Sequence, residues 1–226
     1  MTLITNNLII LQTQIRAAEQ RYRRLPGSVE LLAITKQQTI EHIQQAIDGG
    51  QKKFGENYLQ EALPKITALA DQKLEWHFIG VIQSNKTRII AENFQWVHSI
   101  DCINIAERLN KQRPENLPPL NICLQINIDG EPQKSGLSPE KLIETAHAVT
   151  QLSHLKLRGL MLIPKPYETF EQQREVFKKL RLLLEKLNQQ KFNLNTLSMG
   201  MSQDFTAAIA EGSTLLRIGS TIFGKR

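Results

Sequence analysis

The sequence is poor in the residues that staple or anchor a chain. Its 226 residues include only two cysteines, Cys102 and Cys123, too few for a disulfide framework or a cysteine-rich zinc site. We expect both to be small buried residues of a protein in a reducing compartment, the cytoplasm. No run approaches the roughly 18 uninterrupted apolar residues of a membrane span. The N-terminal segment also lacks the basic start and the small-residue cleavage site of a secretory signal, so no membrane partner is expected.

Signatures of several common activities are absent as well. There is no phosphate-binding P-loop, no nucleophile elbow and no pair of carboxylates at a recognisable spacing. The five histidines do not have the spacing of metal ligands, so no metal is expected. His77 lies between Trp76 and Phe78 and is expected to be a packed, hydrogen-bonded core residue.

The net charge of +6 allows an acidic partner but is not concentrated in a recognised motif. The basic residues between positions 174 and 191 are interleaved with glutamates, which is typical of a solvated helix face. The sequence has no helix-turn-helix, zinc-finger or aromatic RNA-binding motif. Nucleic acid is therefore not expected as a partner.

What the sequence does contain is a regular alternation of short apolar runs and longer amphipathic segments. A first helix is predicted at about residues 3–24 and ends before Pro26-Gly27. Eight strands are predicted at residues 29–35, 53–55, 76–79, 95–100, 120–126, 157–162, 195–199 and 214–218. Because helices are predicted between them, the pattern indicates a parallel sheet covered by helices on its outer side. Eight such units predict an α/β fold, a (β/α)8 TIM-type barrel with an extra N-terminal helix, as a single domain over residues 1–226.

A doubly wound open sheet is the alternative arrangement of the same elements. That fold normally carries a glycine-rich fingerprint directly after its first strand. Here the position holds Lys36-Gln37-Gln38, without a glycine, which favours the barrel.

Lys36 is the first candidate for function. In a (β/α)8 barrel the functional residues follow the C-terminal ends of the strands, and Lys36 follows the first predicted strand. By alternation it shares a face with Leu32 and Ile34. It is either an ordinary surface lysine just past a strand or a partly desolvated amine suited to Schiff-base chemistry.

The turns after the last two strands are the second candidate. They read Ser198-Met199-Gly200-Met201-Ser202 and Gly219-Ser220, at the usual place of the phosphate cradle in this fold. Glycine lets the backbone approach a ligand closely, and the hydroxyls can donate to phosphate oxygens. The alternative is two ordinary turns that need glycine for their geometry. A lysine at the first strand and a phosphate cradle at the last two suit a phosphorylated aldehyde, and pyridoxal phosphate (PLP) is the leading candidate.

Arg217 is charged yet lies in the apolar run of the last predicted strand, on the same side as Gly219. A buried arginine needs a partner. We consider two: a neighbouring acid such as Glu211, or the pyridine nitrogen of the cofactor.

These residues are part of a longer set of motifs by which the sequence resembles the YggS/PROSC type of pyridoxal-phosphate-binding homeostasis proteins, from about residue 24 to the C-terminus. The motifs are Leu32-Ala33-Ile34-Thr35-Lys36, Phe54-Gly55-Glu56-Asn57-Tyr58, Trp76-His77-Phe78-Ile79-Gly80, Gln83-Ser84-Asn85-Lys86, Lys134-Ser135-Gly136, Gly159-Leu160-Met161, Leu197-Ser198-Met199-Gly200-Met201-Ser202 and Arg217-Ile218-Gly219-Ser220. The resemblance implies a barrel like the N-terminal domain of alanine racemase, with PLP bound covalently to Lys36 as a Schiff base. It also implies that Arg217 meets the ring nitrogen and that Asn57 lines the ring. The residues that it places around the phosphate are Ser198, Met201, Ser202, Gly219 and Ser220.

Three functions are compatible with these observations. The resemblance implies a non-catalytic carrier or regulator in intracellular vitamin B6 (PLP) and amino-acid homeostasis, with amino acids and PLP-requiring apoenzymes as candidate partners. The second is a PLP-dependent amino-acid racemase, which needs a second acid or base on the face opposite the lysine. We expect that base to be missing, because in alanine racemase it comes from a second domain. The third is a nucleic-acid or protein-binding module that uses the positive charge. No apolar stripe demands a dimer, so a monomer is expected.

Overall fold

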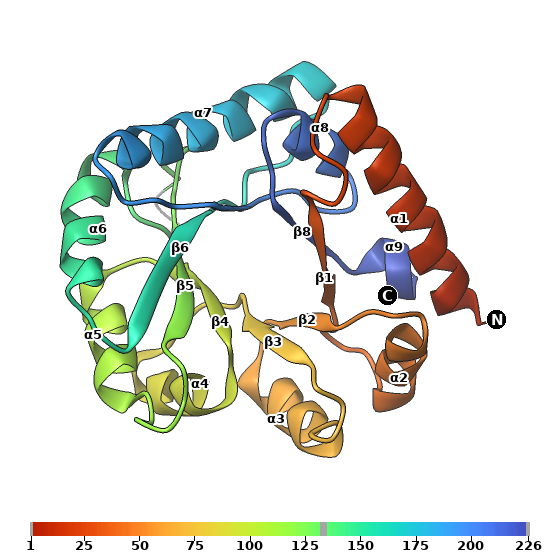
Figure 1. Ribbon diagram of the computed structural model, residues 1–226, viewed down its shortest axis with the longest axis horizontal. Helices are drawn as coiled ribbons and strands as arrows, with labels where there is room; N and C mark the ends of the chain where they lie inside the picture. Colours follow the sequence, from red (N-terminus) through yellow and green to blue (C-terminus); the bar gives the residue numbers. More distant parts are fainter. Residues whose placement is uncertain (1, 132–134, 225–226) are drawn as a thin grey trace.

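Eight parallel strands pair in chain order and close into a barrel, with β1 beside β8 (Figure 1). The computed structural model describes residues 2–131 and 135–224. The strands are β1 (Glu30–Ile34), β2 (Lys53–Glu56), β3 (Glu75–Phe78), β4 (Trp96–Ile100), β5 (Leu120–Gln125), β6 (Leu155–Met161), β7 (Thr196–Ser198) and β8 (Leu215–Ile218). Each lies within two residues of its predicted bounds, and the predicted TIM-type barrel is confirmed.

Helices surround the barrel on its outer side, as the alternation predicts (Figure 1). They are α1 (Leu3–Arg21), α2 (Ile40–Asp48), α3 (Leu59–Ala68), α4 (Thr87–Asn93), α5 (Ile103–Gln112), α6 (Leu142–Thr150), α7 (Phe170–Gln189), α8 (Phe205–Ala210) and α9 (Ser220–Phe223). Short 3₁₀ turns at Ser84–Lys86 and Pro139–Lys141 precede α4 and α6. The short α9 was not predicted.

The N-terminal helix α1 ends at Arg21, three residues before the predicted end. Arg23 has a φ of +54°, in the left-handed region that a helix cannot continue through. The helix is tied down by its own side chains. Glu19 is buried and accepts hydrogen bonds from the backbone N–H of Gly27 (3.0 Å) and of Val29 (2.8 Å), just before β1. At the other end, the Asn7 side chain donates to the Ile222 carbonyl in α9 (2.9 Å).

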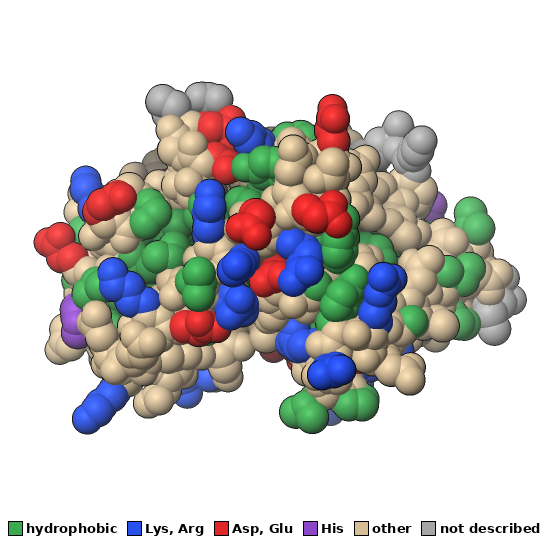
Figure 2. All heavy atoms as spheres, turned by 90° about the horizontal axis from the view of Figure 1, so that it is seen from above, with side chains coloured by type: hydrophobic (Ala, Val, Ile, Leu, Met, Phe, Trp, Pro, Cys, Tyr) green, Lys and Arg blue, Asp and Glu red, His purple; other side chains and the backbone are tan. Residues whose placement is uncertain are grey.

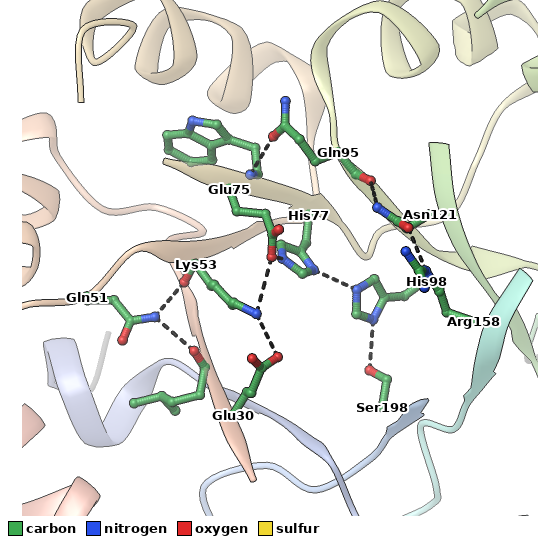
Figure 3. Close-up of polar contacts among 12 residues, drawn as sticks. Glu30, Gln51, Lys53, Glu75, His77, Gln95, His98, Asn121, Arg158 and Ser198 are labelled. Atoms are coloured by element: carbon green, nitrogen blue, oxygen red, sulfur yellow. Dashed lines mark hydrogen bonds and ion pairs between the residues drawn. The ribbon is translucent and has the colours of Figure 1, made fainter. Parts of the chain in front are cut away.

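Most of the apolar core lies between the strands and the helices, and a separate small cluster of Leu32, Ile34, Ile79 and Leu215 lies inside the barrel. Branched aliphatic side chains usually fill this space in a TIM barrel. Here much of it is occupied by polar and charged side chains that are hydrogen-bonded from strand to strand (Figure 3).

The outer surface carries charges of both signs. Figure 2 views the molecule from the side of α7, where basic and acidic side chains are interspersed rather than gathered by sign. On α7, Arg181 pairs with Glu185 at 2.6 Å. Arg174 pairs with Glu211 at 2.6 Å, and Arg181 also reaches Glu211 at 3.4 Å. The predicted solvated helix face is confirmed. In the part of the chain that the structure describes, no helix has the length and apolar character required to cross a bilayer.

The two cysteines lie in different environments. Cys123 is buried inside the barrel, as predicted, but Cys102 is exposed at the start of α5, so the prediction that both are buried is wrong for Cys102. Position explains the difference, because Cys123 is within strand β5 whereas Cys102 follows the end of β4.

Burial raises the pKa of the Cys123 thiol to about 12, so it should be unreactive in the folded protein. We expect Ellman's reagent at pH 8 to modify one thiol per native chain and both thiols after unfolding in guanidinium. A Cys102→Ser variant should show no fast-reacting thiol when native. Rapid modification of both thiols in the native wild type would contradict the buried position of Cys123.

Candidate functional site

Lys36 lies at the C-terminal end of the barrel, directly after β1, and is half-buried. Its Nζ is 5.1 Å from the centroid of the Tyr58 ring, in a cation–π arrangement. Tyr58 follows β2, so this contact joins the ends of two neighbouring strands. The amine is thus held at the rim of the barrel and is not free in solvent.

The backbone before and after Lys36 is held by side chains from β2 and α3. Lys65 is buried, and its Nζ donates to the Thr35 carbonyl and to Glu56 Oε1, both at 2.7 Å. The Thr35 hydroxyl donates to the same carboxylate at 2.6 Å. Beyond Lys36, the Gln37 N–H donates to Glu61 Oε2 at 2.6 Å, in a turn where Gln37 has a φ of +59°. These bonds fix the path of the chain after β1 and hence the position of the Lys36 backbone, from which its side chain extends.

Glu56 is completely buried, and the buried Lys65 is its ion-pair partner. Burial raises the pKa of Glu56, while the hydrogen bonds from Lys65 and Thr35 act in the opposite direction. A buried ion pair of this kind is costly to break from one side, because the remaining charge loses its partner.

Asn57 follows β2 and is half-buried at the same end of the barrel. The loop after β3 approaches it so closely that a Cβ on Gly80 would lie 2.0 Å from the Asn57 carbonyl oxygen, which only glycine permits. The Ser99 hydroxyl donates a hydrogen bond to the Gly80 carbonyl at 2.5 Å and so fixes this loop. A cleft of about 510 Å³ opens beside Asn57 and Tyr58 and reaches Lys86.

The loops after β7 and β8 meet at their hydroxyl groups. Ser202 Oγ and Ser220 Oγ are 3.0 Å apart, although the residues are 18 positions apart in sequence. Gly200 has a φ of +99°, and a Cβ there would lie 2.6 Å from the Ala208 side chain, so this turn requires glycine. Asp204 accepts a hydrogen bond from the Met201 N–H at 2.6 Å. The predicted proximity of the two serine-containing loops is therefore observed.

Gly219 and Ser220 lie where β8 gives way to α9. Gly219 is half-buried and Ser220 is exposed. The first N–H groups of a helix have no acceptor in their own helix, so those at the start of α9 are not bonded within it.

Arg217 is buried in β8, and carbonyls and a hydroxyl bind its guanidinium. Nη1 donates to the carbonyl (2.6 Å) and to the hydroxyl (2.9 Å) of Ser198, and Nη2 donates to the Leu162 carbonyl (2.8 Å). Among the described residues, none accepts a hydrogen bond from Nε. Glu211 pairs with Arg174 and Arg181 instead, so the alternative of an Arg217–Glu211 ion pair is wrong. Burial lowers the pKa of Arg217 to about 10, and the guanidinium therefore stays charged at neutral pH.

A chain of polar groups runs from Arg217 through the barrel to its N-terminal end, and Figure 3 shows the part from Ser198 to Glu75. Ser198 Oγ is 2.8 Å from His98 Nδ1, and His98 Nε2 is 2.8 Å from His77 Nδ1. His77 Nε2 is 2.9 Å from Glu75 Oε1. Ser198, His98 and His77 are all buried, so the prediction that His77 is a packed, hydrogen-bonded core residue is confirmed.

Charge states in this chain follow from burial. Burial lowers the pKa of His77, although the Glu75 carboxylate opposes this. Burial, the neighbouring His77 and the Arg217 charge hold the pKa of His98 well below its usual range. The hydrogen bond from His77, with help from Lys53, lowers the pKa of Glu75 to about 2. At neutral pH the chain therefore has an anion at one end, a cation at the other and two neutral imidazoles between them.

The sequence analysis did not identify His98 or Glu75. Strand alternation puts Glu75 and His77 on one face of β3, and this was the available signal. It does not reveal that His98 on β4 stands beside His77, because the neighbour depends on the register between strands. No cluster of potential metal ligands occurs in residues 2–131 and 135–224.

The predicted site residues lie at one end of the barrel, with one exception. Lys36, Asn57, Met201, Ser202, Gly219 and Ser220 follow the C-terminal ends of β1, β2, β7 and β8, and Arg217 is near the end of β8. Ser198 is the exception, since its hydroxyl lies inside the barrel between His98 and Arg217. Lys134, part of one motif of the resemblance, lies outside the described residues.

Comparison with known proteins identifies the family. The family model described as alanine racemase, N-terminal domain, matches residues 8–226. A pyridoxal phosphate homeostasis protein of Pseudomonas aeruginosa is 53% identical over 226 residues, with 100% of this chain and 97% of that protein covered. The chain belongs to the pyridoxal phosphate homeostasis protein family. Another member of the family, from Escherichia coli K12, is 48% identical, with 99% of this chain and 97% of that protein covered.

Solved structures agree with this family and its fold. PipY of Synechococcus elongatus, solved with PLP bound, superposes with a TM-score of 0.87 at 37% identity and covers 98% of this chain and 100% of its own. Alanine racemase from Corynebacterium glutamicum has a TM-score of 0.70 at 17% identity and covers 99% of this chain but 60% of its own. The racemase likeness shows a shared barrel fold.

The buried Lys65–Glu56 ion pair that supports the backbone before Lys36 can be tested by Lys65→Met. This variant keeps the approximate length of the side chain but leaves Glu56 buried without its cationic partner. We expect a loss of about 3–5 kcal/mol in the free energy of unfolding, measured by denaturant titration. Lys52→Met, at an exposed lysine nearby, should change it by less than about 0.5 kcal/mol. Adding Glu56→Gln to Lys65→Met should recover part of the loss. A loss below about 1 kcal/mol in the single variant would show that Glu56 does not depend on Lys65.

Proposed function

We propose that this chain binds PLP covalently through Lys36, as a Schiff base, and serves intracellular vitamin B6 and amino-acid homeostasis as a carrier or regulator without turnover. The observation that carries the proposal is the arrangement of Lys36 after β1 and of the Ser202–Ser220 hydroxyl pair after β7 and β8, the strands on the other side of the β1–β8 junction. The relatives named as PLP homeostasis proteins and the PLP-bound PipY structure support it.

The residues present fit the cofactor. Lys36 supplies an amine that is held at the rim of the barrel by Tyr58, and we assign Asn57, the residue before Tyr58, to the ring. A phosphate needs several hydrogen-bond donors and a positive potential. The donors that we assign to it are the hydroxyls of Ser202 and Ser220 and the backbone N–H groups of Gly219 and Ser220. Met201, whose N–H already donates to Asp204, is assigned a place beside the phosphate without donating to it.

Ser198 has a different part in this proposal. The resemblance predicts it as a phosphate ligand, but its hydroxyl is buried and hydrogen-bonded to His98 and Arg217. We assign it to the support of Arg217.

Arg217 is the residue that we assign to the ring nitrogen, and its Nε–H and second Nη2–H are the donors that remain for this contact. Bound PLP is an electron sink, most strongly when its ring nitrogen is protonated. A guanidinium can donate to that nitrogen but cannot accept its proton, and the like charge disfavours protonation. Arg217 therefore favours holding the cofactor over using it for reactions at a substrate carbon.

In this proposal the chain acts as one PLP-binding domain over residues 1–226, as a monomer in the cytoplasm. Amino acids and PLP-requiring apoenzymes are its proposed partners, because an amine can take over an aldehyde held as a Schiff base.

The lysine assignment predicts a yellow protein when PLP is added. Borohydride reduction followed by peptide mass spectrometry should place the cofactor on Lys36, and Lys36→Ala should lose both the colour and the label. Lys86→Ala, at the far side of the neighbouring cleft, should keep both. Finding the label mainly on Lys86 or Lys134 would refute the assignment.

The absence of turnover predicts negligible racemisation of alanine by the PLP-loaded protein, because Arg217 leaves a substrate carbanion poorly delocalised. Chiral chromatography after long incubation should find no more isomerisation than with the Lys36→Ala variant plus free PLP. Sustained isomerisation that depends on Lys36 would establish the racemase alternative.

A further inference from the structure

The chain from Glu75 to Arg217 has a direction that its end groups impose. An ionised carboxylate only accepts hydrogen bonds, so His77 Nε2 must carry the proton that is shared with Glu75 Oε1. His77 is neutral, because burial lowers its pKa, and its Nδ1 is therefore an acceptor. The donor in the 2.8 Å contact between the two imidazoles is then His98 Nε2.

The contacts at the opposite end are compatible with the same direction. A guanidinium only donates, so Ser198 Oγ accepts from Arg217 Nη1 at 2.9 Å. Its hydroxyl proton is then available for His98 Nδ1, 2.8 Å away. His98 is neutral and accepts at Nδ1, so its proton lies on Nε2. The contacts of Ser198 thus agree with the Nε2–H tautomer of His98 that follows from Glu75.

We propose that Glu75, His77, His98 and Ser198 form a one-way positioning relay that holds the Arg217 guanidinium in place toward the cofactor. Each link donates toward Glu75, so the Ser198 hydroxyl gives its proton to His98 and presents an oxygen lone pair to Arg217. The part that concerns the cofactor rests on the function proposed above, whereas the direction of the relay is a property of the protein alone.

The surroundings of the relay keep this direction. At the N-terminal end, Lys53 Nζ lies 3.4 Å from Glu75 Oε1 and 2.6 Å from Glu30 Oε2, so Glu75 has a cation beside it. The Trp96 ring stacks on His77 with centroids 5.4 Å apart and an angle of 7° between the planes, which fixes the orientation of the imidazole.

The relay orients Arg217 and does not conduct protons to it. Conduction would require each group to pass on a proton and receive another, and the terminal guanidinium keeps its protons at neutral pH. The residue that anchors the relay, Glu75, is at the end of the barrel opposite the proposed cofactor site. The relay and Arg217 together span four strands, β3, β4, β7 and β8.

The direction can be measured in the cofactor-free wild type. Long-range proton–nitrogen NMR of ¹⁵N-histidine-labelled protein at pH 7.5 distinguishes the two neutral tautomers and the cation. We expect His77 and His98 both as neutral Nε2–H tautomers, assigned with His77→Gln and His98→Gln variants. An Nδ1–H tautomer, or protonation of either ring, overturns the relay whether or not the protein binds PLP.

The positioning of Arg217 is tested by two substitutions at His98. In His98→Gln, the amide oxygen can accept from Ser198 and the amide nitrogen can donate to His77, which reproduces the direction. His98→Phe fills the space but breaks the relay. The readout is the ¹⁵N signal of the ring nitrogen of labelled PLP bound to each protein, with Arg217→Leu as the reference for a missing guanidinium.

We expect the signal in His98→Phe to shift from the wild-type position toward that of Arg217→Leu, and the signal in His98→Gln to stay close to the wild type. A wild-type signal in His98→Phe, or equal shifts in both variants, overturns the positioning role. If PLP fails to label Lys36 in the wild type, the proposed function falls, and the tautomer measurement still decides the relay.

Discussion

A positive charge inside the barrel is the constraint on which much of this structure depends. Arg217 is 4% exposed, and no carboxylate within the described residues forms an ion pair with it. An isolated buried charge costs several kcal/mol unless polar groups replace its water. The carbonyls of Ser198 and Leu162 and the Ser198 hydroxyl take that role. The loop after β6 has no polar side chain at this point, but it contributes to the binding of Arg217 through the Leu162 backbone carbonyl.

The same constraint accounts for the unusual interior of the barrel. Once Ser198 accepts from Arg217, its proton needs an acceptor, and His98 supplies one. His98 in turn needs an acceptor for its own proton, which is His77, and His77 needs Glu75. Glu75 ends the series at the mouth of the barrel, where Lys53 pairs with it. Polar networks in a protein interior stabilise a unique arrangement only when every member is satisfied. The main apolar core accordingly lies outside the barrel, between the strands and the helices.

Much of the fold and part of the site follow from sequence patterns alone. Strand alternation, the positions of glycine and the place of Lys36 depend on residues close together in the chain, and these predictions agree with the structure for the barrel and the serine-containing loops. The partner of Arg217 depends on which residues of other strands stand beside it, and Glu211 proved to face α7 instead. The place of His98 beside His77 depends on strand register in the same way. Helix α1 ends three residues before the predicted end because Arg23 adopts a left-handed conformation, for which the sequence has no signal as strong as a glycine.

Lys36 and Arg217 show two ways in which one barrel fixes a functional side chain. The lysine is long and flexible, so the fold fixes the backbone around it through Thr35, Glu56 and Lys65. The arginine is rigid at its end, so the fold fixes the guanidinium directly. The first device leaves the amine free to react and the second leaves the cation no freedom to move.

Helix α1 extends this logic to a part of the chain that touches neither residue. Through Glu19 it holds the backbone that enters β1, and through Asn7 it holds α9, which follows β8. In Figure 1, α1 lies along the outside of the junction where the first and last strands meet. β1 and β8 pair at four positions, and Lys36 and the Gly219-Ser220 loop follow these two strands. Helix α1 therefore holds the chain on both sides of this junction from the outer surface, and we expect changes in its packing to alter the spacing between Lys36 and the loop after β8.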